Sequence, residues 1–199
     1  GDNMGARRLW GKSTWHDESA GIPLIISGPD IPPGQQIDTP VSLVDMYQTI
    51  LNGVGLKTCD EDKNLPGYSL IDLAINGADE ERIVFGEYHG AGAISAAYMI
   101  RTSKYKYIYY ANGFDPELYD LSNDPEEMEN LAPDQIYKNV IEALYKILKG
   151  ILDPDEVNQQ ALKDQKALVE KHGGREFIIA RGAANNTPVP GEKADLIGT

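Results

Sequence analysis

The sequence of 199 residues has a single cysteine, few basic residues and no long apolar run. One cysteine excludes a disulfide within the chain and any metal site built from several cysteines. The acidic residues at positions 60–62 disfavour the thiolate of Cys59, so a nucleophilic role for this cysteine is not expected. No apolar run approaches the ~20 residues that a membrane helix needs, and we expect no transmembrane helix.

Positive charge is also scarce. Lys and Arg total 18 against 31 Asp and Glu, which gives a formal net charge of -13. Such a field repels phosphate backbones and anionic lipids, so neither a nucleic acid nor a membrane surface is expected as a partner. Any anion site must therefore depend on individual lysine or arginine side chains.

Residues 1–56 are predicted to form the C-terminal end of a larger catalytic α/β domain. Residues 1–21 are rich in glycine and charge and have no regular period, which is typical of an ordered functional loop. Ile22 to Ser27 is a short apolar run that predicts a strand buried on both faces, as in a parallel sheet. Ser42, with Asp45 at the capping-box position, predicts the start of a helix that ends near Gly53 and Gly55.

The remainder predicts a small sheet followed by helices. Residues 57–80 are polar and predict a surface connection, whereas residues 81–151 predict a subdomain of sheet and helix. Four short β-rich segments indicate an antiparallel meander: 83–85, 96–101, 105–110 and 117–121. One amphipathic helix is expected from about Pro133 to Ile151, and residues 152–199 predict a tail helix from Pro154 to His172 and an irregular end.

Two groups of residues stand in a recognisable order. The first comprises Gly1, Gly5, Lys12, Trp15, His16, Asp17, Ser19 and Pro23-Leu24-Ile25. The second comprises Tyr105-Lys106-Tyr107, Glu117-Leu118-Tyr119-Asp120-Leu121, Asp124-Pro125, Glu127 and Asn130-Leu131-Ala132. Together they resemble two signatures of the sulfatases, which belong to the alkaline phosphatase superfamily. The tail is similar to that of bacterial arylsulfatase-like and choline-sulfatase-like members.

This resemblance implies an α/β chain: the C-terminal portion of an alkaline-phosphatase-like α/β/α fold, with a small four-stranded antiparallel sheet packed by a long helix. It implies an enzyme that hydrolyses sulfate monoesters with a divalent metal, expected to be calcium, and a formylglycine nucleophile. Neither Cys59 nor Ser27 fits the C/S-x-P-x-R pattern that formylglycine formation requires. The family's Asp-His metal ligands would precede Gly1. We therefore expect an N-terminally incomplete chain that holds no metal ligand, is inactive alone, and leaves a cytoplasmic or periplasmic location undecided.

Lys12 and His16 are the catalytic candidates. Lys12 matches the family's lysine that contacts the sulfate group, and an ammonium there would stabilise the charge that develops on the nonbridging oxygens. His16 stands where the family usually has an aromatic residue. It is expected either to give a proton to the leaving oxygen or to pack in place of that aromatic residue. Asp17 is expected to hold the loop.

Glu87 and His89 are the substrate-binding candidates. They precede a loop with Gly90 and Gly92 that would roof a substrate pocket, and Glu87 and His89 are expected to help to recognise the leaving group. His89 equally suits a simple turn at a strand end. Two other functions stay open at this point. One is a phosphonate monoester or phosphodiester hydrolase of the same superfamily. The other is a non-catalytic oligomerisation module, and a homo-oligomer formed through the C-terminal helices is expected in addition to the small sulfate ester partner.

Overall fold

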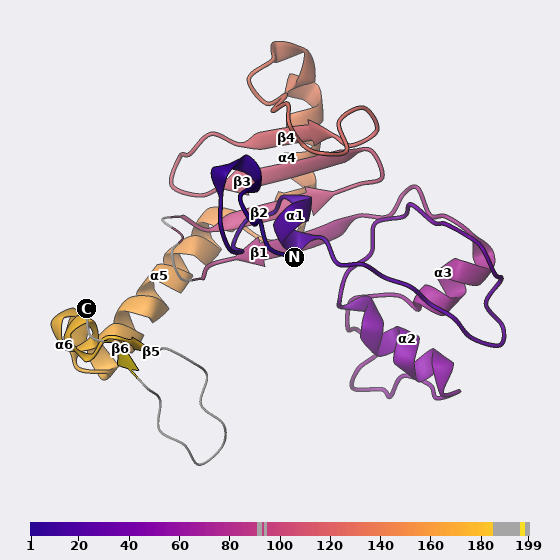
Figure 1. The fold of residues 1–199 in the computed structure, drawn as a ribbon, viewed down its shortest axis with the longest axis horizontal. Coiled ribbons are helices and arrows are strands. Elements are labelled where there is room, and N and C mark those ends of the chain that lie inside the picture. The colour runs from indigo at the N-terminus through magenta and orange to yellow at the C-terminus, as the bar shows by residue number, and fades with distance from the viewer. Residues whose placement is uncertain (91–92, 94, 185–195, 198–199) are drawn as a thin grey trace. The chain divides into compact units, whose positions relative to one another are not determined.

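The computed structural model describes residues 1–90, 93, 95–184 and 196–197 (Figure 1). The chain divides into two compact units, Gly1–Pro154 and Asp155–Thr199. All of the candidate site residues lie in the first unit.

A four-stranded antiparallel sheet forms the centre of the first unit. Its strands follow chain order: β1 (Val84–Tyr88), β2 (Ala97–Arg101), β3 (Tyr105–Tyr110) and β4 (Glu117–Asp120). The meander predicted from the sequence is confirmed. Asn112 and Gly113 lie between β3 and β4 with φ angles of 63° and 76°, which the sequence Asn-Gly adopts at little cost.

Helix α4 (Lys138–Ile151) covers one face of this sheet, as predicted, and follows the short helix η2 (Gln135–Tyr137). Its Leu144 and Leu148 are buried. The ring of Tyr145 lies 5.4 Å from that of Tyr109 on β3. This arrangement gives the predicted small sheet packed by a long helix, within an α/β chain.

The opening segment lies against the other face of the sheet, as Figure 1 shows. It contains two short helices, η1 (Ala6–Arg8) and α1 (Asp17–Ala20). Trp15 packs on the buried cluster of this face, which consists of Val84, Met99, Ile108 and Tyr119. Gly86 makes room for it, because a Cβ on Gly86 would lie 2.6 Å from the Trp15 ring.

Two helices in the first unit, α2 (Asp45–Gly53) and α3 (Leu70–Asn76), pack against each other. Helix α2 was predicted, but its N-cap is Val44 rather than Ser42, and no side chain caps it. Only one half of the predicted capping box is present: the Asp45 carboxylate accepts a hydrogen bond of 2.7 Å from the Ser42 backbone N–H. Helix α3 was missed within the predicted connection. Its signal is present in the sequence, since the Ser69 hydroxyl accepts from the Asp72 backbone N–H at its start.

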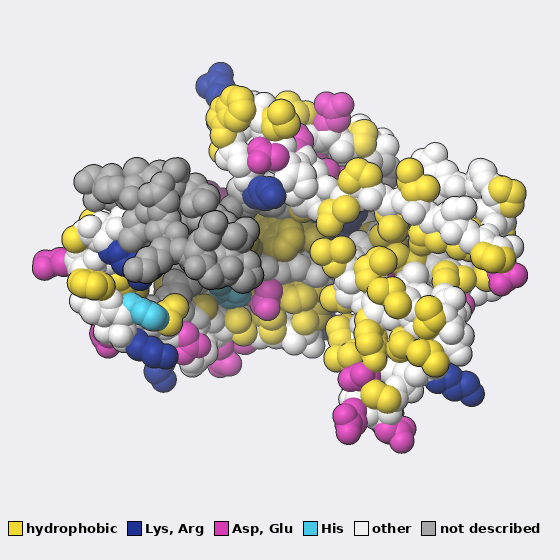
Figure 2. Space-filling model, turned by 60° about the horizontal axis from the view of Figure 1, so that its bottom comes forward, with side chains coloured by type: hydrophobic (Ala, Val, Ile, Leu, Met, Phe, Trp, Pro, Cys, Tyr) yellow, Lys and Arg dark blue, Asp and Glu magenta, His cyan; other side chains and the backbone are white. Residues whose placement is uncertain are grey.

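The prediction of a buried strand over Ile22–Ser27 is wrong for this structure. Among the described residues no strand pairs with this segment, and the side chain of Ile25 is 94% exposed. A strand needs a neighbour for its N–H and C=O groups, and the apolar pattern alone does not supply one. Figure 2 shows hydrophobic side chains gathered over the region of α2 and α3. The exposed members between residues 22 and 56 are Ile22, Leu24, Ile25, Leu43, Val44, Tyr47, Ile50, Val54 and Leu56.

The second unit consists mainly of helix. The predicted tail helix is α5 (Pro154–Lys171), and a further helix, α6 (Gly174–Arg181), was missed because the pair Gly173-Gly174 was interpreted only as an end. Strands β5 (Ala183–Ala184) and β6 (Leu196–Ile197) pair with each other. The predicted irregular stretch with Asn185, Pro188 and Pro190 lies outside the described residues. Within the described parts of the chain, no helix has the length and apolarity that crossing a bilayer requires.

Candidate functional site

Hydrogen bonds hold the residues on both sides of Lys12, whereas the Lys12 side chain is exposed. On one side, the Gly11 carbonyl accepts hydrogen bonds of 2.8 Å from the Asn3 backbone N–H and from the Asn3 side chain. On the other side, Ser13 Oγ accepts a hydrogen bond of 2.8 Å from the Tyr88 hydroxyl. Lys12 itself makes no hydrogen bond or ion pair with any part of the chain that the structure describes. The loop therefore presents a free ammonium group from a fixed backbone.

The same loop has an unusual backbone. Gly11 and Ser13, which flank Lys12, have φ angles of 82° and 84°, and Arg7 and Arg8 have φ angles of 53° and 60°. A residue with a side chain adopts such angles only where its surroundings enforce them, and such residues cluster at functional sites. The loop conformation thus depends on the contacts that hold it.

Beneath the loop lies a charge cluster that consists of Lys106, Asp17, Glu127 and His16. Three of these side chains are buried, whereas that of Asp17 is 43% exposed. The Lys106 ammonium, with 1% of the residue exposed, donates a hydrogen bond of 3.0 Å to the Trp15 carbonyl and also donates to the carboxylates of Asp17 and Glu127. Glu127 Oε2 accepts a hydrogen bond of 3.2 Å from the Asp17 backbone N–H. The cluster joins the start of α1 to β3 and to the turn after β4.

Two cations act on Asp17. Burial would raise the pKa of its carboxyl group, but Lys106 and Arg101 outweigh burial and hold that pKa below its ordinary value. Arg101 Nη1 lies 2.9 Å from Asp17 Oδ1, and Arg101 on β2 is the cross-strand partner of Lys106 on β3. Asp17 therefore stays ionised at neutral pH and bridges two strands.

His16 is buried between two carboxylates. Its Nδ1 lies 3.1 Å from Glu127 Oε2, its Nε2 lies 3.7 Å from Glu117 Oε2, and its ring meets the edge of Tyr119 at 5.6 Å. The structure thus places Lys12 and His16 in one loop but in different surroundings, the first in solvent and the second under the loop.

Glu87 and His89 lie together, with His89 Nε2 3.4 Å from Glu87 Oε2. Glu87 is the cross-strand partner of Tyr98, whereas Tyr88 pairs with Ala97. Because side chains alternate along a strand, Glu87 points to the face that α4 covers, and Tyr88 points to the face that carries the Lys12 loop. The structure therefore joins the Lys12 loop to β1 through Tyr88 rather than through the predicted pair. Gly92, in the expected roof, lies outside the described residues.

Sequence reasoning missed the roles of Lys106 and Glu127. Both stand in the second group of matched residues, but nothing local says what they contact. Their partners in the first group are 89 and 111 residues away along the chain, so Lys106 with Asp17 and His16 with Glu127 meet only in the folded state. The two groups of residues that were recognised separately in the sequence thus contact each other in the folded chain.

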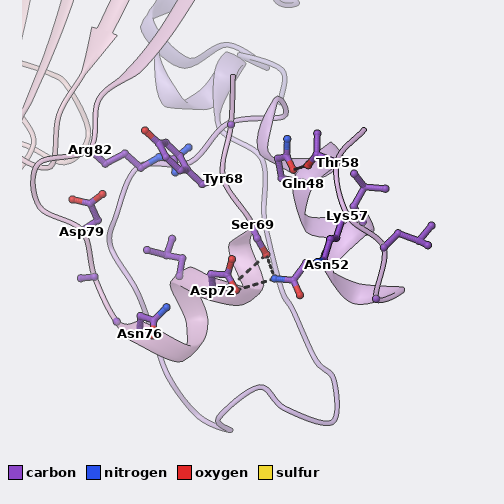
Figure 3. A pocket seen from close by; sticks show the side chains of 17 residues that line it. Gln48, Asn52, Lys57, Thr58, Tyr68, Ser69, Asp72, Asn76, Asp79 and Arg82 are labelled. Atoms are coloured by element: carbon purple, nitrogen blue, oxygen red, sulfur yellow. Dashed lines mark hydrogen bonds between the residues drawn. The ribbon is translucent and has the colours of Figure 1, made fainter. Parts of the chain in front are cut away.

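A pocket of about 710 Å³ lies elsewhere, between α2 and α3 (Figure 3). Asn52 Nδ2 donates hydrogen bonds of 2.8 Å to Ser69 Oγ and to Asp72 Oδ1 at its wall. The Arg82 guanidinium lies 4.6 Å above the Tyr68 ring. None of the four predicted site residues lines it, and it is not the site that the sequence predicted.

The described residues supply no metal centre of their own. In those parts of the chain no group of three or more His, Cys, Asp or Glu side chains converges as metal ligands. Calcium takes about six to eight oxygen ligands. The buried carboxylate of Glu127 is instead occupied by Lys106, His16 and the Asp17 N–H.

Comparison with solved structures shows the fold of this region in known enzymes. A 2-O GAG sulfatase, BT1596, is 25% identical with a TM-score of 0.65, over 84% of this chain and 36% of that chain. A phosphonate monoester hydrolase of Agrobacterium radiobacter is 28% identical with a TM-score of 0.61, over 75% of this chain and 32% of that chain. The architecture is therefore shared by hydrolases of two related activities.

Sequence comparison identifies the family. Arylsulfatase K of Gallus gallus is 33% identical over 181 residues, which are 86% of this chain and 31% of the relative. Arylsulfatase K of Danio rerio is 35% identical over 173 residues, 83% of this chain and 32% of the relative. The chain thus spans about a third of the length of the curated relatives that it matches. Residues 5–154 match the family model "N-sulphoglucosamine sulphohydrolase, C-terminal", and the chain belongs to this family of sulfatase C-terminal domains.

Proposed function

We propose that this chain is the C-terminal part of a sulfatase that hydrolyses sulfate monoesters, and that Lys12 contacts the sulfate group. The longer protein is called the complete enzyme below. The observation that carries this proposal is the Lys12 loop: an exposed, unpaired ammonium on a loop held by hydrogen bonds from Asn3 to Gly11 and from Tyr88 to Ser13. The family match and the arylsulfatase relatives support the same activity.

Lys12 would act by charge. As the sulfuryl group passes from the ester oxygen to the nucleophile, negative charge is spread over its nonbridging oxygens, and a positioned cation lowers the energy of that transition state. A cation that is already in place needs no reorganisation as the charge develops. The overall negative charge of the chain, -13, makes such a local cation necessary for an anionic substrate.

For His16 we favour the packing role over proton donation. Its ring is buried and both ring nitrogens face carboxylates, from Glu127 and Glu117. A His16→Gln variant of the complete enzyme tests this choice. If His16 only packs, the variant keeps the pH profile of the wild type. If it donates a proton, the variant loses the limb of the profile on which activity falls as this proton is lost.

Glu87 and His89 stay candidates for recognition of the leaving group. Their 3.4 Å contact at the end of β1 holds the imidazole beside the carboxylate. In this role, His89→Ala would raise KM for a bulky sulfate ester more than for a small one. Equal changes in KM would assign His89 to the turn.

Calcium and formylglycine belong to the proposal only as groups of the complete enzyme. The described residues do not fit a calcium site, since Glu127 is already satisfied by its partners in the charge cluster. The part that we assign to this chain is to bind the sulfate group through Lys12 and to hold the loop.

The exposed apolar run Ile22–Ser27 supports a longer protein. Ile22, Leu24 and Ile25 are 60%, 46% and 94% exposed, although their pattern is that of a buried strand. We propose that this run packs on the remainder of the complete enzyme.

Turnover of matched esters by the complete enzyme tests the proposed activity. We expect a higher kcat/KM for 4-nitrophenyl sulfate than for a 4-nitrophenyl phosphonate monoester. The reverse order would favour the alternative of a phosphonate monoester hydrolase, which the structural neighbour from Agrobacterium radiobacter represents. Because the leaving group is the same, the comparison reports only on the group that is transferred.

A further inference from the structure

We infer that Lys106 is a positioning residue, which holds the Lys12 loop in its working conformation on the sheet; this inference rests on the proposed function. Lys106 lies on β3 and is 1% exposed, so it touches no substrate. Its ammonium donates to the Trp15 carbonyl and to the Asp17 carboxylate, three and five residues beyond Lys12.

The ammonium group of Lys106 connects separate parts of the chain. An ammonium has three N–H donors, and here each has an acceptor: the carbonyl of Trp15 and the carboxylates of Asp17 and Glu127. Two of these acceptors belong to the loop segment, and the third belongs to the turn after β4. One side chain thus ties three separate parts of the chain together.

Glu127 holds both the Lys106 ammonium and the opening segment. Its side chain is fully buried, and its φ angle is 55°, in the left-handed region that residues with side chains avoid. Its carboxylate accepts from Lys106, and its backbone carbonyl accepts from the Arg7 guanidinium. The same residue therefore holds the loop on both sides of Lys12.

Stability alone does not explain the buried pair of Lys106 and Glu127 in this cluster. Removing two charges from water is costly, and replacement of a buried ion pair by apolar side chains is often neutral or stabilising. A directional cluster instead selects one arrangement of its members. Here that arrangement fixes the backbone of residues 15–17, which follow the left-handed Ser13.

The test is a double-mutant cycle in the complete enzyme. Lys106→Met is made in the wild type and in a Lys12→Ala background, and kcat and KM for 4-nitrophenyl sulfate are measured. Lys104→Met is the matched control, because Lys104 lies in the turn before β3 and contacts Tyr105 and Asp120 rather than the loop.

We expect Lys106→Met to lower kcat by about 10- to 100-fold with little change in KM, because a shift of about 1 Å in a catalytic group costs this much. The same change in the Lys12→Ala background should have almost no further effect on kcat, since the group being positioned is gone. Lys104→Met should leave kcat unchanged. Equal losses of kcat in both backgrounds, or no loss in the wild type, would overturn the inference.

A second variant covers the case in which Lys106→Met does not fold. The single change leaves Glu127 as a buried unpaired charge, so Lys106→Met combined with Glu127→Gln removes both charges together. The same cycle is then measured with the pair.

Failure of the proposed function gives a different result. If Lys12→Ala alone leaves kcat unchanged, Lys12 has no catalytic role. The proposed function of Lys12 and the inference that Lys106 positions it are then both overturned. If Lys12→Ala lowers kcat but Lys106→Met does not, only the inference is overturned.

Trypsin cleavage after Arg8 and Lys12 gives a readout that does not need turnover. We expect faster cleavage in Lys106→Met than in Lys104→Met. Equal cleavage rates would contradict the role of Lys106 in holding the loop.

Discussion

Replacement of Gly86 by alanine should loosen the opening segment from the sheet. A Cβ at this position would lie 2.6 Å from Cη2 and 2.7 Å from Cζ3 of the Trp15 ring. Carbon atoms pack at about 3.5–4.0 Å, so the ring must move by about 1 Å. Trp15 Nε1 donates to the Ala97 carbonyl at 3.2 Å, close to the upper limit for such a bond, and this movement would break it.

The magnitude follows from three contributions. Overpacking costs about 1–3 kcal/mol. A lost hydrogen bond adds about 1 kcal/mol, and the reduced freedom of the unfolded chain returns about 0.4–1 kcal/mol. We expect a net loss of about 1–3.6 kcal/mol and, for a domain of this size, a Tm lower by about 2–14 °C.

Gly150→Ala provides the matched control. Gly150 is exposed in α4, and a Cβ there would meet nothing within 4 Å. The same substitution should therefore stabilise the chain by about 0.5–1 kcal/mol. Both variants are measured by thermal and urea unfolding, followed by circular dichroism. The reasoning is refuted if Gly86→Ala melts at or above the wild type, or if it destabilises a Trp15→Ala background as much as the wild type.

Three further predictions concern the helix, the charge cluster and the apolar run. Leu148→Ala, at a fully buried position of α4, should cost about 2–5 kcal/mol of unfolding free energy in urea titration. The control is Ile136→Ala, at a position that is 82% exposed, and its unfolding free energy should stay within about 0.5 kcal/mol of the wild type. Similar losses for both variants would contradict the packing of α4 on the sheet. The folded pKa of Asp17 lies below its ordinary 3.8, so its contribution to stability is present above pH 3.8 and is lost as the pH falls below this value. The stability difference between the wild type and Asp17→Asn should accordingly narrow below pH 3.8, and a difference independent of pH would exclude the ionised carboxylate as its source. Ile25→Ala should change the stability of this chain by less than about 0.5 kcal/mol and that of the complete enzyme by about 2–5 kcal/mol, whereas equal effects would show that the run is exposed in both.

The sequence predicted those elements whose signals are local. The meander was readable because tyrosine, isoleucine and valine are concentrated in short runs separated by Thr102-Ser103 and Asn112-Gly113. Helix α4 was readable from its apolar stripe, which includes the buried Leu144 and Leu148. These patterns need no knowledge of a distant partner.

The elements that failed needed such knowledge. Ile25 stands in an apolar run that is typical of a buried strand, yet it is exposed. A strand is buried only where neighbouring strands pair with it, and the run itself does not show whether such strands are present. Lys106 stands between two tyrosines in β3, and alternation shows only that it points to the opposite face from theirs. That this face carries Asp17 and the Lys12 loop follows from the folded chain alone.

The central claim is that the chain holds Lys12 in place to bind a sulfate group, and the rate of sulfate release by the complete enzyme tests it most directly. Lys12→Ala is compared with Lys63→Ala, the removal of another exposed lysine, whose nearest acidic partner, Asp60, is 3.9 Å away. The account predicts that Lys12→Ala lowers kcat on 4-nitrophenyl sulfate by about 10²- to 10³-fold, while Lys63→Ala leaves it unchanged. Equal rates for the two variants would contradict it.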